Sequence, residues 1–204
     1  MKILAIGKNY VNNIEEISAL KNGKQVIFSK PESSLVLNNQ NVAFPTFTKE
    51  LFYEIELVLK IGKSGKNISK ENAESYISEI AIGIDYTAKD ILSDCRENKG
   101  PWDLAKGFDG AAPISKFISI NQFQNLSSIN FDLKINGEQK QIGNTSKMIY
   151  NFKEIIAYLS KFMTLEPGDL IFTGTPATGA GKNTKGDHIQ GSLEGELLID
   201  YKLI

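Results

Sequence analysis

The chain has 204 residues, of which 41% are hydrophobic and 23% are charged, and these proportions are ordinary for one packed globular domain. Its 23 lysine and arginine residues face 24 aspartate and glutamate residues, so the formal net charge of −1 gives no electrostatic reason to expect nucleic acid or an anionic membrane as the main partner. No apolar run approaches the roughly 20 residues of a membrane span, and we expect a single cytoplasmic domain over residues 1–204.

Short apolar or alternating runs, bounded by Gly, Asn and Pro, predict a strand-rich chain. The runs expected to form strands are Lys2–Ile6, Val26–Phe28, Leu51–Ile61, Ile80–Ile84, Ile129–Ile135, Asp169–Thr173 and Glu196–Leu203. Asn136-Gly137 predicts a hairpin turn, because both residues tolerate positive φ. Helices are expected at Asn12–Leu20, Lys70–Ser78 and Lys153–Met163. This order of elements predicts an α+β fold or a β-roll rather than a doubly wound sheet.

The segment Phe52–Leu59 carries the strongest local signal for chemistry. Residues two apart on a strand point to the same face, so Glu54 and Glu56 project together while Ile55 and Leu57 face the other way. Two carboxylates inside so apolar a strand repel each other and lose solvation unless a positive charge lies between them. A hard divalent cation, Mg²⁺ or Mn²⁺, would supply that charge. Two solvated side chains on the outer face of an edge strand are the alternative.

A further acidic residue, Asp85, directly follows the apolar run Ile80–Ile84 and precedes a helix start. This is a good position for a metal ligand, although acidic residues there are commonly turn or cap residues. Thr87 and Asp90 have the spacing of a capping box, and we expect Asp90 to cap the helix.

The stretch Leu170–Lys182 is rich in glycine and threonine but does not satisfy the pattern of a phosphate-binding P-loop. Asn183 follows its Gly-Lys pair, and Pro176 occupies the position of the required upstream glycine. The residues alone leave two interpretations open. The turn presents the hydroxyl groups of Thr173 and Thr175 to an anion, or it is a surface turn without a ligand.

Neither the only cysteine nor the only histidine gives a sign of catalysis. A single cysteine, Cys95, excludes an intrachain disulfide and gives no argument for secretion. Asp94 and Glu97 disfavour its thiolate, although Arg96 opposes them, and no base is near it in sequence. His188 lies in a late polar turn and is expected on the surface.

Several short motifs, each weak alone, occur in an order that covers nearly the whole chain. They are Gly7–Tyr10, Phe28–Pro31, Tyr53–Leu57, Gly83–Asp90, Pro101–Asp109, Asn136–Glu138, Asn144–Ile149 and Gly168–Pro176. In this order the chain resembles the fumarylacetoacetate hydrolase superfamily, in particular its short single-domain members that act as acylpyruvases, oxaloacetate decarboxylases or diene-dioate isomerases. The resemblance implies a mixed β-sandwich roll with a few flanking helices, usually assembled as a homodimer.

The resemblance also implies the residues of an active site. It carries Glu54, Glu56 and Asp85 over as ligands of Mg²⁺ or Mn²⁺. Lys106 matches the active-site lysine of the family, where it neutralises negative charge near the metal, and Thr175 matches a residue that holds the substrate carboxylate.

Other matched positions lie near the N-terminus. Lys8 and Asn9 occupy the place of an Arg-Asn pair that lines the substrate pocket in the family. Relatives carry a catalytic His–Glu pair on a mobile lid, which corresponds to residues 10–22 of this chain. The glutamate is kept as Glu16, but Asn13 replaces the histidine and cannot act as a general base near neutral pH.

Two further departures concern substrate contacts. Lys89 replaces a usual arginine and loses the bidentate fork for a carboxylate, and Leu92 replaces a glutamine. The expected function is metal-dependent chemistry on a small 2-oxo acid through a stabilised enolate, either acylpyruvate hydrolysis or oxaloacetate decarboxylation or tautomerisation. The alternative is a metal-binding pseudoenzyme that binds a 2-oxo acid without turnover.

Overall fold

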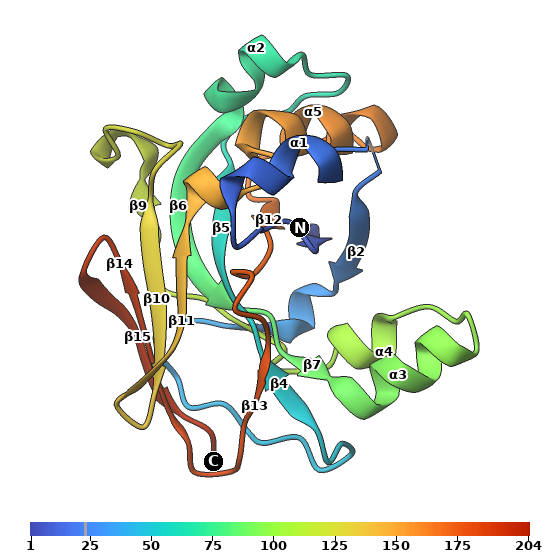
Figure 1. Ribbon diagram of the computed structural model, residues 1–204, viewed down its shortest axis with the longest axis vertical. Coiled ribbons are helices and arrows are strands. Elements are labelled where there is room, and N and C mark those ends of the chain that lie inside the picture. The colour runs from blue at the N-terminus through green and yellow to red at the C-terminus, as the bar shows by residue number, and fades with distance from the viewer. Residues whose placement is uncertain (23) are drawn as a thin grey trace.

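The computed structural model describes residues 1–22 and 24–204 and shows two β-sheets packed against each other with short helices around them (Figure 1). The larger sheet has six strands in the order β2-β1-β12-β5-β6-β9. In that order the strands span Val26–Lys30, Ile3–Gly7, Leu170–Phe172, Ile55–Ile61, Ile77–Ile84 and Ile118–Ser119. β1 pairs with β12 in parallel and the other neighbours are antiparallel, so the sheet is mixed.

The second sheet is antiparallel and has the strand order β11-β10-β14-β15. These strands span Glu138–Asn144, Asn130–Ile135, His188–Leu193 and Glu196–Lys202. The predicted hairpin joins β10 to β11, and Asn136 and Gly137 have φ angles of 54° and 81°. β14 was not expected, because polar residues occupy its outward positions and Gly191 one of its inward ones. The α+β class and the mixed roll are therefore confirmed.

Short elements complete the fold. The minor strands pair as β13-β4-β7 and β3-β8 and span Gly181–Lys182, Leu51–Tyr53, Thr87–Ala88, Leu35–Val36 and Ala112–Pro113. Helices α1 to α5 span Ile17–Leu20, Lys70–Ala73, Lys89–Glu97, Asp103–Lys106 and Phe152–Phe162. Single 3₁₀ turns lie at Ile14–Glu16, Glu32–Ser34, Glu74–Tyr76, Ile120–Gln122 and Thr145–Lys147. Figure 1 shows α1, α2 and α5 together at one end, and α3 beside α4 at the other.

The structure confirms the predicted helix with the clearest apolar stripe, which is α5. The other two predicted helices are shorter than expected. α5 begins at a capping box, in which Asn151 accepts a hydrogen bond from the backbone of Glu154 and Glu154 accepts one in return. The expected helices Asn12–Leu20 and Lys70–Ser78 are each reduced to a 3₁₀ turn joined to four α-helical residues. Their thin apolar faces bury too little surface to extend them.

Alternation along β5 separates the core of the sandwich from the functional face. Ile55 and Leu57 belong to the large apolar cluster between the sheets, whereas Val58 belongs to a second cluster on the opposite face. Glu56 has the alternation of Val58, so it points away from the sandwich core, as the strand period predicted. The expected single strand Leu51–Ile61 is interrupted at Glu54. β4 pairs with β7 and β13, whereas β5 belongs to the six-stranded sheet.

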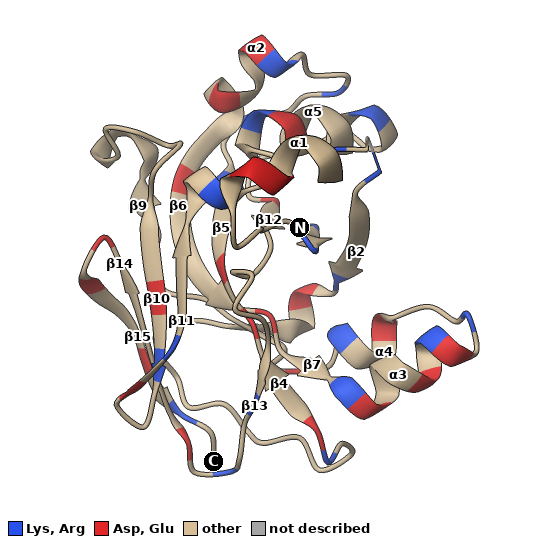
Figure 2. Cartoon of the chain, viewed as in Figure 1, with Lys and Arg blue, Asp and Glu red and all other residues tan. Residues whose placement is uncertain are grey.

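Charged residues are spread over the helices and strands, and blue and red segments alternate along α3 and α4 (Figure 2). Over residues 1–22 and 24–204, the helices are too short and too polar to cross a membrane.

Gly83 on β6 holds a position where the sheet has no room for a side chain. A Cβ atom there would lie 2.8 Å from a ring carbon of Phe172 and 3.0 Å from a methyl carbon of Val58, and both neighbours are fully buried. Because a close-packed interior cannot yield by that much, we expect Gly83→Ala to lower the free energy of unfolding by about 1–3 kcal/mol. Denaturant unfolding measures the change.

Gly100→Ala is the matched control, because a Cβ atom there approaches only the Cys95 carbonyl oxygen, at 3.8 Å. The control should unfold at or above the denaturant midpoint of the unsubstituted protein. Equal losses in the two variants would contradict the packing argument.

Candidate active site

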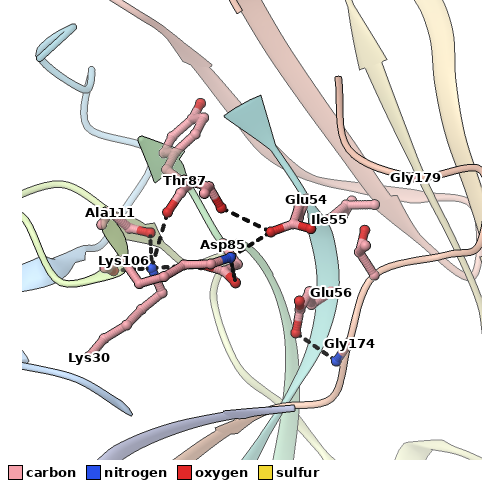
Figure 3. Close-up of polar contacts among 12 residues, drawn as sticks. Lys30, Glu54, Ile55, Glu56, Asp85, Thr87, Lys106, Ala111, Gly174 and Gly179 are labelled. Atoms are coloured by element: carbon pink, nitrogen blue, oxygen red, sulfur yellow. Dashed lines mark hydrogen bonds and ion pairs between the residues drawn. The ribbon is translucent and has the colours of Figure 1, made fainter. Parts of the chain in front are cut away.

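A cleft opens beside the β4–β5 junction, the end of β6 and the helices α3 and α4, and it encloses about 570 Å³ of empty space with its open mouth included. Four buried or half-buried charged side chains line its floor, namely Glu54, Glu56, Asp85 and Lys106. Figure 3 shows the side chains of Glu54, Asp85 and Lys106 meeting from three separate segments of the chain, whereas the Glu56 carboxylate turns to the Gly174 backbone. The structure therefore places the three predicted metal ligands and the predicted active-site lysine in the lining of one cleft.

Glu54 is placed by the break between β4 and β5. Its backbone carbonyl accepts a hydrogen bond of 2.8 Å from the Asp85 N–H, which ties the two acidic positions together. Its carboxylate accepts a bond of 3.0 Å from the Thr87 hydroxyl and one of 2.6 Å from the Lys106 ammonium (Figure 3). The side chain thus points into the cleft with two donors holding one oxygen.

Thr87 does not cap α3, so the predicted capping box is wrong. The residue before the helix is Ala88, and the Thr87 hydroxyl is committed to Glu54. Asp90 accepts a bond of 2.9 Å from the Ile91 backbone N–H, and it also fixes the segment before β4 by accepting bonds from Thr48 and Lys49. No local sequence pattern predicts that the Thr87 hydroxyl binds the carboxylate of Glu54, which lies 33 residues earlier.

Asp85 is 1% exposed and is balanced by two lysines. Lys106 Nζ lies 2.7 Å from one carboxylate oxygen, and Lys30 Nζ lies 2.6 Å from the other. Burial by itself would raise the pKa of Asp85, but the ammonium groups of Lys106 and Lys30 outweigh it and hold that pKa below its ordinary value. Asp85 is consequently an anion buried between two cations.

Lys30 is a site residue that sequence reasoning did not single out. Its side chain is fully buried, and its ammonium also donates to the backbone carbonyls of Tyr86, Lys106 and Ala111 (Figure 3). It thereby joins β2 to the loops on both sides of the cleft floor. The only available signal was its place in the matched motif Phe28–Pro31.

The charged form of Lys106 is favoured in this structure. Burial would lower its pKa, but the carboxylates of Asp85 and Glu54 reverse this and raise the pKa above the ordinary value. The Nζ atom also lies 4.8 Å from the centre of the Phe28 ring, a cation–π contact that further favours the ammonium.

Glu56 is the least compensated charge of the floor. It is 3% exposed and accepts one hydrogen bond of 2.7 Å from the Gly174 N–H. Burial, followed by the charges of Asp85 and Glu54, raises the pKa of Glu56 well above its ordinary value, and the Gly174 bond offsets only part of that shift. A cation beside Glu56 would oppose this shift by favouring the charged carboxylate.

Thr175 lines the cleft, and Gln141 of β11 holds it in place. Gln141 accepts a bond of 2.8 Å from the Ile55 N–H and donates bonds of 2.8 Å to the Thr175 hydroxyl and the Gly179 carbonyl. One buried amide therefore fastens the Thr175 loop to β5. Nothing in the local sequence of Gln141 indicated this role.

Three cations stand at the outer part of the cleft: Lys8, Lys89 and Arg96. Lys8 is exposed and has a positive φ of 57°. Lys89 and Leu92, the two departures that the family resemblance implied, also line the cleft. Both substitutions therefore lie where a bound molecule would meet them.

The remaining predicted residues lie elsewhere. Asn9 is 1% exposed, and its amide is committed to the backbone of Tyr150 and Thr173, so it supports the cleft from behind rather than lining it. Glu16 and Asn13 are exposed, and Asn13 accepts a bond from the Glu15 N–H. None of residues 10–22 lines the cleft in this structure.

The lone cysteine and histidine are also outside the cleft. Cys95 lies on α3 but not among the lining residues. His188 is half-buried at the start of β14, where it contacts Asp200. Neither residue is placed to act on a bound molecule.

The donor set of the floor suits a hard divalent cation, because three carboxylates supply oxygen ligands only. Among residues 1–22 and 24–204, no three His, Cys, Asp or Glu side chains converge as closely as a bound metal requires. The reason is Lys106, whose ammonium occupies the space between Glu54 and Asp85. An additional positive charge in this cleft would nevertheless be favourable, because the nearby Lys106 does not fully balance the Glu56 carboxylate.

The fold and the site define a class of small mixed β-rolls with a cleft that gathers carboxylates and a lysine at its floor. The chain belongs to the fumarylacetoacetate hydrolase family, because the protein-family model described as "Fumarylacetoacetate (FAA) hydrolase C-terminal" matches residues 2–198. The family expected from the sequence motifs is thereby confirmed.

Similar proteins bear the names of enzymes that act on small oxo acids. The mitochondrial oxaloacetate tautomerase of Bos taurus is 35% identical over 201 residues, which cover 98% of this chain and 90% of the relative. The mitochondrial oxaloacetate decarboxylase of Dictyostelium discoideum is 35% identical over 195 residues, or 95% and 89% of the two chains. Fumarylpyruvate hydrolase from Pseudomonas aeruginosa, solved in complex with Mn²⁺ and pyruvate, superposes with a TM-score of 0.89 at 33% identity and covers 100% and 90% of the chains.

Glu56→Gln provides a test of the uncompensated charge. The folded-state pKa of Glu56 lies above the ordinary value of 4.5, so its contribution to stability is fully present below that pH and is lost as the pH rises through the folded-state pKa. A neutral glutamine keeps an acceptor for the Gly174 N–H and avoids this loss. Without added metal, we expect Glu56→Gln to be more stable than the unsubstituted protein at pH 8, by on the order of 1–3 kcal/mol, and the difference to vanish near pH 4.

Thermal unfolding from pH 4 to pH 8 in the presence of a chelator measures this difference. Glu79→Gln is a suitable control, because Glu79 is half-exposed and lies outside the cleft, where it pairs with Lys60. A Glu56→Gln variant that is less stable than the unsubstituted protein at pH 8 would show that the Glu56 charge is already balanced.

Proposed function

We propose that the chain is a divalent-metal-dependent enzyme that tautomerises or decarboxylates small 2-oxo acids such as oxaloacetate. The observation that carries the proposal is the gathering of three carboxylates and Lys106 at the floor of one cleft. The names of the bovine and Dictyostelium relatives support the reaction, and the relative solved with Mn²⁺ and pyruvate supports the metal and the 2-oxo acid.

Glu54, Glu56 and Asp85 are the residues that would hold Mg²⁺ or Mn²⁺. Binding through all three requires the Lys106 ammonium to withdraw from the space between Glu54 and Asp85. Asp85 keeps Lys30 as its partner when this happens, so the buried charge remains balanced. When bound, the cation would supply Lewis acidity, which stabilises the negative charge that develops on a 2-oxo acid when a proton passes from its third carbon to solvent water, or when a carboxylate on that carbon leaves as CO2.

Lys106 and Thr175 act directly on the substrate in this proposal. The Lys106 ammonium brings positive charge to the floor and stabilises the same developing charge. The Thr175 hydroxyl accepts a bond from Gln141, which leaves its own proton to donate to a substrate carboxylate. Since Gln141 also anchors Ile55 on β5, the hydroxyl is oriented before substrate binds.

Acylpyruvate hydrolysis is the second candidate reaction, and the fumarylpyruvate hydrolase relative favours it. Hydrolysis requires a base that activates water, and the loss of such a base typically costs about 10²–10⁴-fold in rate. The only histidine, His188, is on β14 and outside the cleft, and Asn13 stands where relatives carry the lid histidine. Tautomerisation and decarboxylation depend mainly on stabilising the developing charge, so they lose less.

Glu56→Ala is the direct test of the proposed function. We expect the unsubstituted protein to turn over oxaloacetate only with Mg²⁺ or Mn²⁺, and the variant to lose at least about 100-fold in kcat/KM, because one ligand of the charge-stabilising centre is removed. Spectrophotometric assays of oxaloacetate and of an acylpyruvate, with metal or with chelator, measure this. Glu79→Ala outside the cleft should retain full activity.

Calorimetric titration with Mg²⁺ and Mn²⁺ separates the pseudoenzyme alternative from the enzyme. Metal uptake without turnover of any 2-oxo acid would identify a binding protein rather than a catalyst. Absence of uptake would remove the basis of the metal-dependent proposal.

Asn13→His tests the proposed lid. We propose that residues 10–22, including Glu16, close over the cleft when substrate is bound, and that a histidine at this position then restores a base for water. We expect Asn13→His to raise acylpyruvate hydrolysis by at least about 10-fold and to leave oxaloacetate tautomerisation unchanged. The neighbouring exposed Asn12→His is the control and should change neither rate. Unaltered hydrolysis in Asn13→His would contradict lid closure at this position.

A homodimer and a cytoplasmic location remain predictions from the family resemblance and the sequence. Size-exclusion chromatography with light scattering measures the first, and fractionation of the source cells the second.

A further inference from the structure

The cleft contains the only arginine of the chain beside the only tryptophan. Arg96 lies in the last turn of α3, and its guanidinium carbon is 5.1 Å from the centre of the Trp102 ring. A guanidinium that lies over an aromatic face keeps its N–H groups at the edge, where they can bind a carboxylate with two parallel hydrogen bonds. Trp102 therefore holds Arg96 in a binding-competent orientation.

Aromatic contacts continue from Arg96 to the acidic floor. The Trp102 and Phe28 ring centres are 5.8 Å apart, and the Phe28 ring centre is 4.8 Å from Lys106 Nζ. Two aromatic side chains thus lie between the arginine at the outer part of the cleft and the lysine at the floor. The two cations therefore line the same cleft, with the two rings between them.

The cations of the floor and of the outer cleft differ in their partners. Lys30 and Lys106 are paired with Asp85 and Glu54. Within residues 1–22 and 24–204, no carboxylate lies at ion-pair distance from Lys8, Lys89 or Arg96, and Lys89 Nζ instead lies 5.7 Å from the centre of the Phe52 ring. The outer cleft therefore presents positive charge that is not neutralised by the protein itself.

Helix α3 presents this charge in a fixed pattern. Lys89, Leu92 and Arg96 are spaced by three and four residues, so they share one helical face, and all three line the cleft. Leu92 gives this face an apolar middle with cations on both sides. Arg96 differs from Lys89 in having the planar fork and an aromatic support, which favour a carboxylate over a diffuse anion.

We propose that Arg96 is a specificity-determining residue that binds the far carboxylate of a 2-oxo dicarboxylate of four or five carbons. This inference rests on the proposed function, because it takes the 2-oxo acid end of the substrate to lie at the acidic floor. A monocarboxylate or a substrate with a neutral acyl end gains nothing from Arg96, so the residue selects dianions.

Binding of a matched pair of ligands tests the proposal without turnover. 2-Oxopentanoate has a methyl group where 2-oxoglutarate has its far carboxylate, and the two are otherwise alike. With Mg²⁺ present, we expect calorimetry to show that the unsubstituted protein binds 2-oxoglutarate about 10- to 100-fold more tightly. Arg96→Gln should abolish this preference and leave the affinity for 2-oxopentanoate unchanged.

The control variant is Lys99→Gln, which removes the same charge three residues later at an exposed position that does not line the cleft. It should keep the full preference, whereas a preference lost equally in both variants would indicate general electrostatic attraction and overturn the proposal. Tryptophan fluorescence provides an independent readout, because Trp102 is the only tryptophan. The emission should change with 2-oxoglutarate and not with 2-oxopentanoate.

Kinetics distinguishes failure of this inference from failure of the proposed function. If oxaloacetate is turned over, Arg96→Gln should raise KM about 10- to 100-fold with kcat within about twofold, and Arg96→Lys should recover only part of the loss. An unchanged KM with normal turnover would overturn the role of Arg96 and leave the function standing. A preference for 2-oxoglutarate that depends on Arg96, without turnover of any 2-oxo acid, would overturn the function and leave the role of Arg96 standing.

Discussion

The balance of charge around the buried Asp85 is the constraint on which the rest of the site depends. A buried carboxylate without a partner would cost several kcal/mol, and here Lys30 and Lys106 supply two ammonium groups from segments far apart in the sequence. Lys30 belongs to β2, Lys106 to α4, and Asp85 follows β6, so two ion pairs that share Asp85 fix three elements at the cleft. The neighbouring Glu54 shares Lys106, which makes the floor a single electrostatic unit.

This unit leaves the cleft with two electrostatic regions. At the floor the carboxylates outnumber the cation that faces the cavity, and the raised pKa of Glu56 reflects the excess, through burial first and then the charges of Asp85 and Glu54. In the outer part, Lys8, Lys89 and Arg96 line the cavity without carboxylate partners in the described chain. Such a gradient suits a cation at the bottom and a small anion above it.

Hydrogen bonds from neutral groups hold Glu56 and Thr175 in place at the cleft. The Gly174 N–H binds Glu56, and Gln141 joins the Thr175 loop to Ile55 on β5. Both contacts use rigid backbone or a buried amide, so Glu56 and Thr175 are oriented in the free protein. Among residues 1–22 and 24–204, no histidine lines the cleft, and the proposal of a reaction that needs no activated water rests on this observation.

The sequence by itself determined the face on which Glu54 and Glu56 lie, the position of Asp85 after a strand and the hairpin at Asn136-Gly137. These features follow from a period of two residues and from local φ preferences, which any short segment carries within itself. Only the tertiary structure decided that Lys30 pairs with Asp85, that Thr87 binds Glu54 instead of capping α3, and that Asn9 faces the interior. Local pattern shows which way a side chain points, but its partner comes from strands and loops brought together by packing of the whole chain, over separations of 33 residues for Thr87 and 164 for Asn9.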